Sequence, residues 1–131
     1  MRGLNVYWVS YMRRDSPKPE NERYGAELRH LRERKGMSLR TLAGKLGIQP
    51  PHLSKVELGI VSVSEELSND AAKILEVDPI VLYSFSGRVT KELQEVIVKH
   101  PKAFADLILH LKSAPEKTIL RLVREVRDGD W

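Results

Sequence analysis

Residues 21–60 carry eight basic side chains and four acidic ones, which gives this stretch a net charge of +4. The basic members are Arg23, Arg29, Arg32, Arg34, Lys35, Arg40, Lys45 and Lys55. Clustered positive charge is the electrostatic footprint of a surface that binds phosphate groups. Residues 61–87, in contrast, have a net charge of −4. Solvated helix faces would give the same counts, so charge alone leaves both interpretations open.

Other chemistries find little support in the sequence. The chain has no cysteine, which excludes disulfides, thiolate metal sites and cysteine nucleophiles. Its four histidines show neither HExxH nor zinc-finger spacing, so we expect no metal and no cofactor. A phosphate-cradling glycine loop and a GxSxG motif are also missing. We therefore expect that the protein is not an enzyme.

The composition is that of a small globular protein. The chain has 131 residues, of which 41% are hydrophobic, enough for one domain plus an appendage. No apolar run approaches the roughly 18–20 residues that span a bilayer, and the start lacks a signal-peptide layout. We expect a cytoplasmic protein.

Residues 38–59 meet the demands of two short helices joined at a right angle. Leu42 and Leu46 are one turn apart, and Ala43 is small enough for a close approach of the two helices. Gly47 can adopt the positive φ that the turn needs, and the apolar Ile48 follows it. Leu53 and Val56 then point inward from the second helix. Together these positions predict a helix-turn-helix.

Further helices surround this motif. Tyr24, Leu28 and Leu31 predict a helix from about residue 20 to residue 35, ahead of the motif. Ser64 and Asp78-Pro79 are typical starts for two more helices behind it. Three amphipathic helices follow, with breaks at His100-Pro101 and at a capping box over residues 113–116.

The predicted fold is therefore all-α, with a short extended arm at the N-terminus. Residues 4–12 alternate β-branched and aromatic side chains, which favours a strand or arm. We expect an N-terminal arm and linker over residues 1–20, a DNA-binding domain over 21–87 and a C-terminal helical extension over 88–131.

Residues 22–83 resemble the lambda-repressor/Cro-like helix-turn-helix domain, the XRE family. The likeness rests on the five-helix order, Arg-Lys-Gly-Met-Ser-Leu entering the motif, Leu-Ser-Lys-Val-Glu on the third helix, and Val-Asp-Pro opening the fifth. It implies that the third helix enters the major groove of DNA. It also implies an internal ion pair between Arg32 and Glu57.

The resemblance implies two sets of DNA contacts. Exposed positions near the start of the third helix would contact base edges, and they are Gln49, Pro51, His52, Ser54 and Lys55. Pro51 departs from the polar residue usual in the family and offers only an apolar contact. Ser38, Arg40 and Lys45 on the second helix are candidates for phosphate contacts.

The function that follows is a sequence-specific regulator of transcription that binds double-stranded DNA as a homodimer and acts as a repressor. Helices of about ten residues are marginal alone, so the C-terminal ones must find a partner surface. The expected dimer interface comprises Leu107, Ile108, Leu111, Ile119, Leu122, Val123 and Val126. The alternative is that these helices complete a monomeric core. An antitoxin-like or immunity-repressor protein, which binds an unknown partner protein as well as its own operator, is the second functional hypothesis.

Overall fold

The computed structural model describes residues 16–129 and divides into two compact units, the first ending at Thr90 and the second beginning at Lys91. The predicted arm over residues 4–12 lies outside the described residues. Every regular element in residues 16–129 is a helix, which confirms the predicted all-α fold.

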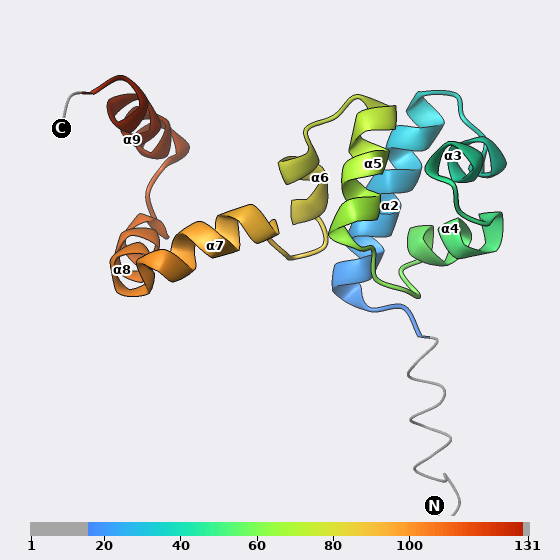
Figure 1. Ribbon diagram of the computed structural model, residues 1–131, viewed down its shortest axis with the longest axis horizontal. Helices are drawn as coiled ribbons and strands as arrows, with labels where there is room; N and C mark the ends of the chain where they lie inside the picture. Colours follow the sequence, from blue (N-terminus) through green and yellow to red (C-terminus); the bar gives the residue numbers. More distant parts are fainter. Residues whose placement is uncertain (1–15, 130–131) are drawn as a thin grey trace, which may run out of the picture. The chain divides into compact units, whose positions relative to one another are not determined.

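Within residues 16–90, the first unit contains five helices (Figure 1). They are α2 (Pro19–Arg34), α3 (Leu39–Leu46), α4 (Pro50–Glu57), α5 (Glu65–Leu75) and α6 (Pro79–Ser84). The long helix α2 contacts α4 and α6, while α3 contacts α4 and α5. Helix α5 also contacts α6. The two short helices α3 and α4 are thus held against a frame made of α2, α5 and α6.

Three of these helices begin at side-chain caps. The Ser38 hydroxyl accepts a hydrogen bond from the Thr41 amide at 3.1 Å, and the Ser64 hydroxyl accepts one from the Leu67 amide at 3.1 Å. The Asp78 carboxylate accepts from the Ile80 amide at 2.8 Å. Each cap satisfies an amide that has no partner inside its own helix, so the start of each helix is fixed by the residue that precedes it.

One core lies inside the first unit. It comprises the buried side chains of Tyr24, Leu28, Leu42, Ala43, Leu53, Val56, Val63, Ala71, Ala72, Leu75, Leu82 and Tyr83. All five helices contribute to it, so the positions of α3 and α4 are fixed by the same buried apolar surface. The inward positions predicted for the helix-turn-helix are among these residues or pack against them.

The second unit contains α7 (Lys91–Lys99), α8 (Pro101–Leu111) and α9 (Glu116–Asp128). Helix α7 contacts α8. Within residues 91–129 no side chain is buried, although α8 and α9 are rich in leucine, isoleucine and valine. No helix among the described residues is long and apolar enough to cross a membrane.

The start of α9 corrects one expectation. The capping box over residues 113–116 is not formed, because α9 begins at Glu116 with Pro115 as its N-cap and no side-chain cap. The Ala114 amide instead donates to the Leu111 carbonyl at 3.0 Å, which completes the end of α8. Proline disfavours helical geometry in the residue before it, so the new helix cannot begin ahead of Pro115.

Candidate nucleic-acid interface

The turn between α3 and α4 is built around Gly47. This residue has φ +69°, in the left-handed region that glycine adopts without strain. The next amide, that of Ile48, donates back to the Ala43 carbonyl at 3.0 Å, which closes α3 and redirects the chain. Ala43 is fully buried, so α4 can lie close to α3 at this point. These contacts form the predicted helix-turn-helix.

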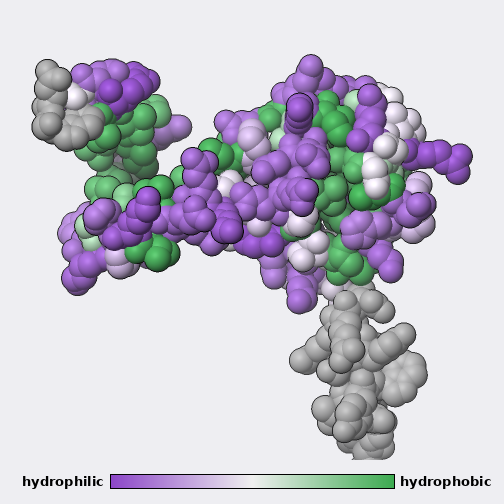
Figure 2. Space-filling view, in the orientation of Figure 1, coloured by the Kyte–Doolittle hydropathy of each residue, from purple (hydrophilic) through white to green (hydrophobic). Residues whose placement is uncertain are grey.

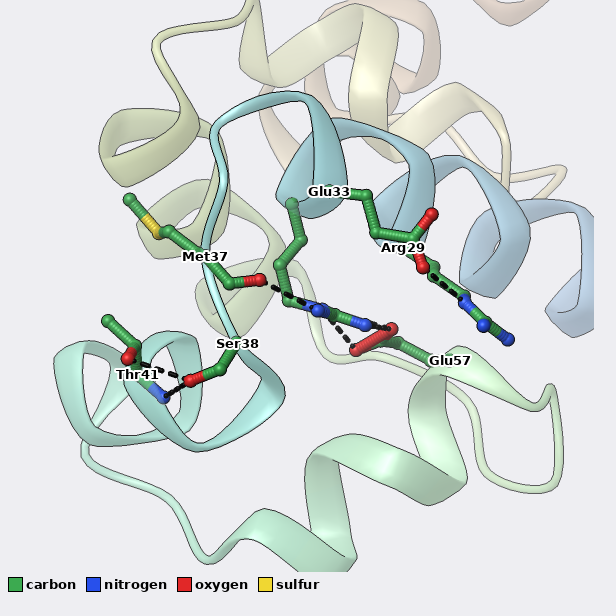
Figure 3. A network of polar contacts seen from close by, with 7 residues as sticks. Arg29, Glu33, Met37, Ser38, Thr41 and Glu57 are labelled. Atoms are coloured by element: carbon green, nitrogen blue, oxygen red, sulfur yellow. Dashed lines mark hydrogen bonds and ion pairs between the residues drawn. The ribbon is translucent and has the colours of Figure 1, made fainter.

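The C-terminal end of α4 is fixed to α2 by an ion pair (Figure 3). An Arg32 Nη2 atom lies 2.9 Å from Glu57 Oε1, and Arg32 Nε donates to both carboxylate oxygens at 3.2 and 3.1 Å. The side chains are only 11% and 5% exposed. Arg32 Nη1 also donates to the Met37 carbonyl at 2.8 Å. A single guanidinium therefore joins α2, the end of α4 and the residue before the α3 cap.

Gly25 lets the backbones of α2 and α4 come into direct contact. A Cβ atom there would lie 2.3 Å from the Glu57 carbonyl oxygen and 2.4 Å from that of Val56. No side chain larger than hydrogen fits in that space, so the packing of α4 against α2 depends on Gly25. The sequence offered no periodic signal for this contact.

The side chains expected to contact DNA lie on the outside of α3 and α4. Ser38, Arg40, Lys45, Gln49, Pro51, His52 and Lys55 are exposed, and Ser54 is half-buried. Within residues 16–129, the only internal side-chain hydrogen bonds in this set are those of Ser38 to Thr41. The charged and amide groups of α3 and α4 are therefore available to an external ligand.

Backbone donors are distributed unequally between the two helices. Pro50 and Pro51 have no N–H, and the His52 amide already donates to the Gln49 carbonyl at 3.0 Å. The Leu39 and Arg40 amides, in the first turn of α3, have no acceptor among the described residues. The first turn of α3 can thus donate backbone hydrogen bonds to a phosphate, whereas the first turn of α4 has no free backbone N–H.

The exposed faces of α3 and α4 carry only positive charge. Between Ser38 and Leu58 the only carboxylate is that of Glu57, and the ion pair with Arg32 neutralises it. Arg40, Lys45 and Lys55 have no carboxylate within ion-pair distance among residues 16–129. An exposed surface with three uncompensated cations and several hydrogen-bonding groups is chemically suited to a polyanion.

The residues expected at a dimer interface lie in the second unit, where α8 and α9 flank an apolar groove. Its volume is about 640 Å³, and its lining includes Phe104 and Arg127 together with six of the seven expected residues: Leu107, Leu111, Ile119, Leu122, Val123 and Val126. Ile108 is half-exposed outside the lining. Figure 2 shows hydrophobic surface over these two helices. The groove is open, so these side chains are incompletely covered within the described chain.

Two crystal structures of the clp gene regulator ClgR from Corynebacterium glutamicum are similar to this chain. One is 32% identical and covers 55% of this chain and 92% of its own, with a TM-score of 0.48. The other is 23% identical and covers 76% of this chain and 100% of its own, with a TM-score of 0.49.

Sequence comparison gives a match to a family model described as a helix-turn-helix domain, at residues 23–82. The chain is 33% identical over 78 residues to two uncharacterized HTH-type transcriptional regulators of Mycobacterium tuberculosis, one from each of two strains. The match covers 56% of this chain and 56% of each relative, so the chain spans about half the length of these curated relatives. The family match includes α3 and α4 with the turn between them.

Proposed function

Residues 23–82 of this chain belong to the helix-turn-helix domain family, and from that premise we propose that the protein is a sequence-specific regulator of transcription that binds double-stranded DNA. The observation that carries the proposal is the uncompensated positive charge on the exposed faces of α3 and α4. Glu57, the one carboxylate in this stretch, is neutralised inside the domain. This face therefore attracts a polyanion, and no nearby carboxylate repels it.

We assign base recognition to the exposed side chains of α4. Gln49 can form two hydrogen bonds with adenine, and Lys55 can donate to the acceptors of guanine. His52 and Ser54 can reach a base or a phosphate, while Pro51 offers an apolar contact such as that with a thymine methyl group. Because α4 has no free backbone donor in its first turn, any phosphate contact it makes comes from side chains, and its main contribution is specificity.

We assign the phosphate contacts to α3. The unpaired Leu39 and Arg40 amides lie at the positive end of the helix dipole, beside the cap residue Ser38. The Arg40 side chain adds an exposed positive charge, and Lys45 adds another at the far end of the helix. These contacts would fix the register of α4 on the duplex without reading its sequence.

We further propose that two copies associate through the apolar groove of α8 and α9. A single helix-turn-helix gives few base contacts, and regulators of this kind gain specificity by binding two half-sites about 34–36 Å apart. Pairing of two copies would cover the half-exposed leucines and valines of the second unit. Such a dimer bound to an operator would keep polymerase away from the DNA. We therefore propose that the protein acts as a repressor in the cytoplasm.

Binding of the full chain to labelled duplex DNA at increasing salt tests the proposal. Each neutralised phosphate releases counterions, so the logarithm of affinity should fall linearly with the logarithm of salt concentration. Three to five phosphate contacts would give a slope of roughly −3 to −5. Affinity that does not change between low and moderate salt would refute an electrostatic DNA interface.

A further inference from the structure

An apolar hollow lies on the first unit where α2 and α6 meet. The two helices contact each other and leave a notch of about 90 Å³ between them. We call it the α6 notch, and its apolar wall comprises Leu31, Val77, Val81, Leu82 and Phe85. Val81 is 56% exposed, and its neighbour Ile80 is 52% exposed. Exposed apolar side chains that gather around a hollow favour a contact with another protein surface.

The charged groups that line the α6 notch are both carboxylates, those of Glu27 and Asp78. Asp78 is occupied as the cap of α6, where it accepts a hydrogen bond from the Ile80 amide at 2.8 Å. Glu27 is half-buried, and its carboxylate forms no ion pair with any residue in 16–129. The oxygens of Glu27 reach solvent, so they are open to an external partner. The notch therefore suits a partner that offers an aliphatic side chain next to a cation.

Helix α9 presents that combination outside its apolar groove. Lys117, Leu120 and Arg124 are spaced i, i+3 and i+7, so they share one face of the helix. Leu120 is 49% exposed and does not line the groove. Lys117 and Arg124 have no carboxylate within ion-pair distance among residues 16–129, whereas Arg121 and Arg127 each have one. We call Lys117, Leu120 and Arg124 the α9 strip, an aliphatic side chain between two cations.

We propose that the α6 notch receives Leu120 from α9 of a second copy of this chain, with Glu27 pairing with a cation of the α9 strip. Charge complementarity supports this occupant, because an acidic apolar notch meets a basic apolar strip. The proposal rests on the association of two copies in the proposed function and gives that association a second contact. Pairing through the grooves would leave the α9 strips uncovered, since the strip lies outside the groove lining.

Such a contact would set the distance between the two DNA-binding faces. The groove joins only the second units of two copies, whereas the notch holds the first unit of one copy to the second unit of the other. The two α4 helices would then be held at one separation, which half-sites about 34–36 Å apart require.

Disulfide trapping tests this contact cleanly, because the chain has no cysteine of its own. Full-length Val81→Cys and Leu120→Cys chains, with tags of different size, are mixed in a glutathione redox buffer. A contact between copies raises the effective concentration of the two thiols, so their mixed disulfide should form roughly tenfold faster than that of a control pair. The control mixes Val81→Cys with Val98→Cys, because Val98 is an exposed residue of α7 outside the α9 strip.

Charge reversal provides a second readout. Glu27→Lys, added to the Val81→Cys chain, should lower the trapping rate about threefold to tenfold, because it places like charges together. Lys117→Glu and Arg124→Glu, added to the Leu120→Cys chain, should restore the rate. This recovery cannot come from improved folding of the Glu27→Lys chain, since the compensating changes lie on the other chain. Glu22→Lys is the matched control, because it reverses an exposed carboxylate of α2 outside the notch, and it should keep the rate within about twofold.

The outcomes separate this contact from the proposed function. Equal trapping rates in the test and control pairs, with a wild type that sediments as a dimer, would overturn the notch contact and leave the homodimer standing. Equal rates with a monomeric wild type would overturn both. A disulfide that forms within a Val81→Cys/Leu120→Cys double variant but not between the two single variants would overturn the assignment to a second copy. Trapping needs no DNA, so a chain that binds no DNA fails the proposed function while the trapping rates still decide the notch.

Discussion

The guanidinium of Arg32 and the carboxylate of Glu57 form three contacts of 2.9 to 3.2 Å across the interface between α2 and α4. The same guanidinium donates to the Met37 carbonyl, one residue before the Ser38 cap of α3. Both helices of the helix-turn-helix are therefore held in position by one side chain of α2. This pair has a positioning role and also removes the only negative charge from the motif.

Breaking this pair should destabilise the first unit strongly. Glu57→Gln leaves the Arg32 charge almost buried without its counterion, and such a loss costs about 3–5 kcal/mol. Urea denaturation followed by circular dichroism measures the change. Arg29→Gln serves as the control, since it removes an exposed pair with Glu33 on the same helix. Equal midpoints for the wild type and Glu57→Gln would contradict the role given to the buried pair.

The close approach at Gly25 predicts that two glycine-to-alanine variants differ sharply in stability. Gly25→Ala places a methyl group 2.3 Å from the Glu57 carbonyl oxygen, so α2 and α4 must separate, at a cost of about 3 kcal/mol or more. Gly44→Ala meets no atom within 4 Å and should stabilise α3 by up to about 1 kcal/mol. Thermal denaturation distinguishes them, and similar midpoints for both variants would contradict the packing.

The starts of the helices and their inward faces could be predicted from the sequence, because both depend on residues that are close together in the chain. Ser64 and Asp78 each cap the helix that their sequence position suggested. Gly47 has the positive φ expected from its place between two amphipathic segments. Local signals failed at residues 113–116, where the cap residue was in place but Pro115 prevented the helix from starting early.

Features that depend on distant residues could not be obtained in this way. The steric need for Gly25 arises from α4 carbonyls some thirty residues later in the chain. A pocket of the first unit brings Arg88 beside the first turn of α2, and no spacing rule links these positions. The Arg32–Glu57 pair was available only through family resemblance, since neither residue stands out by its own spacing.

Tyr24 should make stability depend on pH in the alkaline range. Burial raises the pKa of Tyr24 from 10.0 to about 12, although its hydrogen bond to the Ser68 hydroxyl at 2.9 Å acts in the opposite direction. The native state thus disfavours ionisation, so its stability is fully present below pH 10 and declines as pH rises towards 12. The loss should reach about 2–3 kcal/mol.

The variant Tyr24→Phe provides the comparison for this pH effect. It leaves the buried Ser68 hydroxyl without its partner and should lower stability at neutral pH by about 1–3 kcal/mol. The decline between pH 10 and 12 should then become smaller, because the titrating group is gone. A wild type and a Tyr24→Phe variant that lose stability in parallel above pH 10 would contradict the shifted pKa.

Two variants on the exposed faces of α3 and α4 should differ in how they change DNA binding. Lys55→Ala should relax sequence preference, because a good contact to a base edge is worth about 1–3 kcal/mol of discrimination. Arg40→Ala should weaken binding to all sequences about equally and reduce the salt slope by about 1. Competition binding with a preferred duplex and a scrambled one measures both effects. Equal loss of preference in the two variants would refute the division of roles.

A single charge introduced into the apolar groove should change the oligomeric state of the protein. Val123→Glu places a carboxylate in the groove lined by α8 and α9, so a homodimer formed there should dissociate to monomer in analytical ultracentrifugation. Val98→Glu is the control, because Val98 is 71% exposed on α7 and does not line the groove. A Val123→Glu protein that sediments like the wild-type dimer would place the interface elsewhere.

Selection from a random duplex library measures whether the exposed faces of α3 and α4 recognise duplex DNA by sequence. The full chain should enrich a motif of two inverted half-sites whose centres are about one helical turn apart. The variant Gln49→Ala/Lys55→Ala should bind the library yet lose that motif. Failure of the wild-type chain to enrich any motif, or enrichment of an identical motif by the double variant, would refute sequence recognition by these two faces.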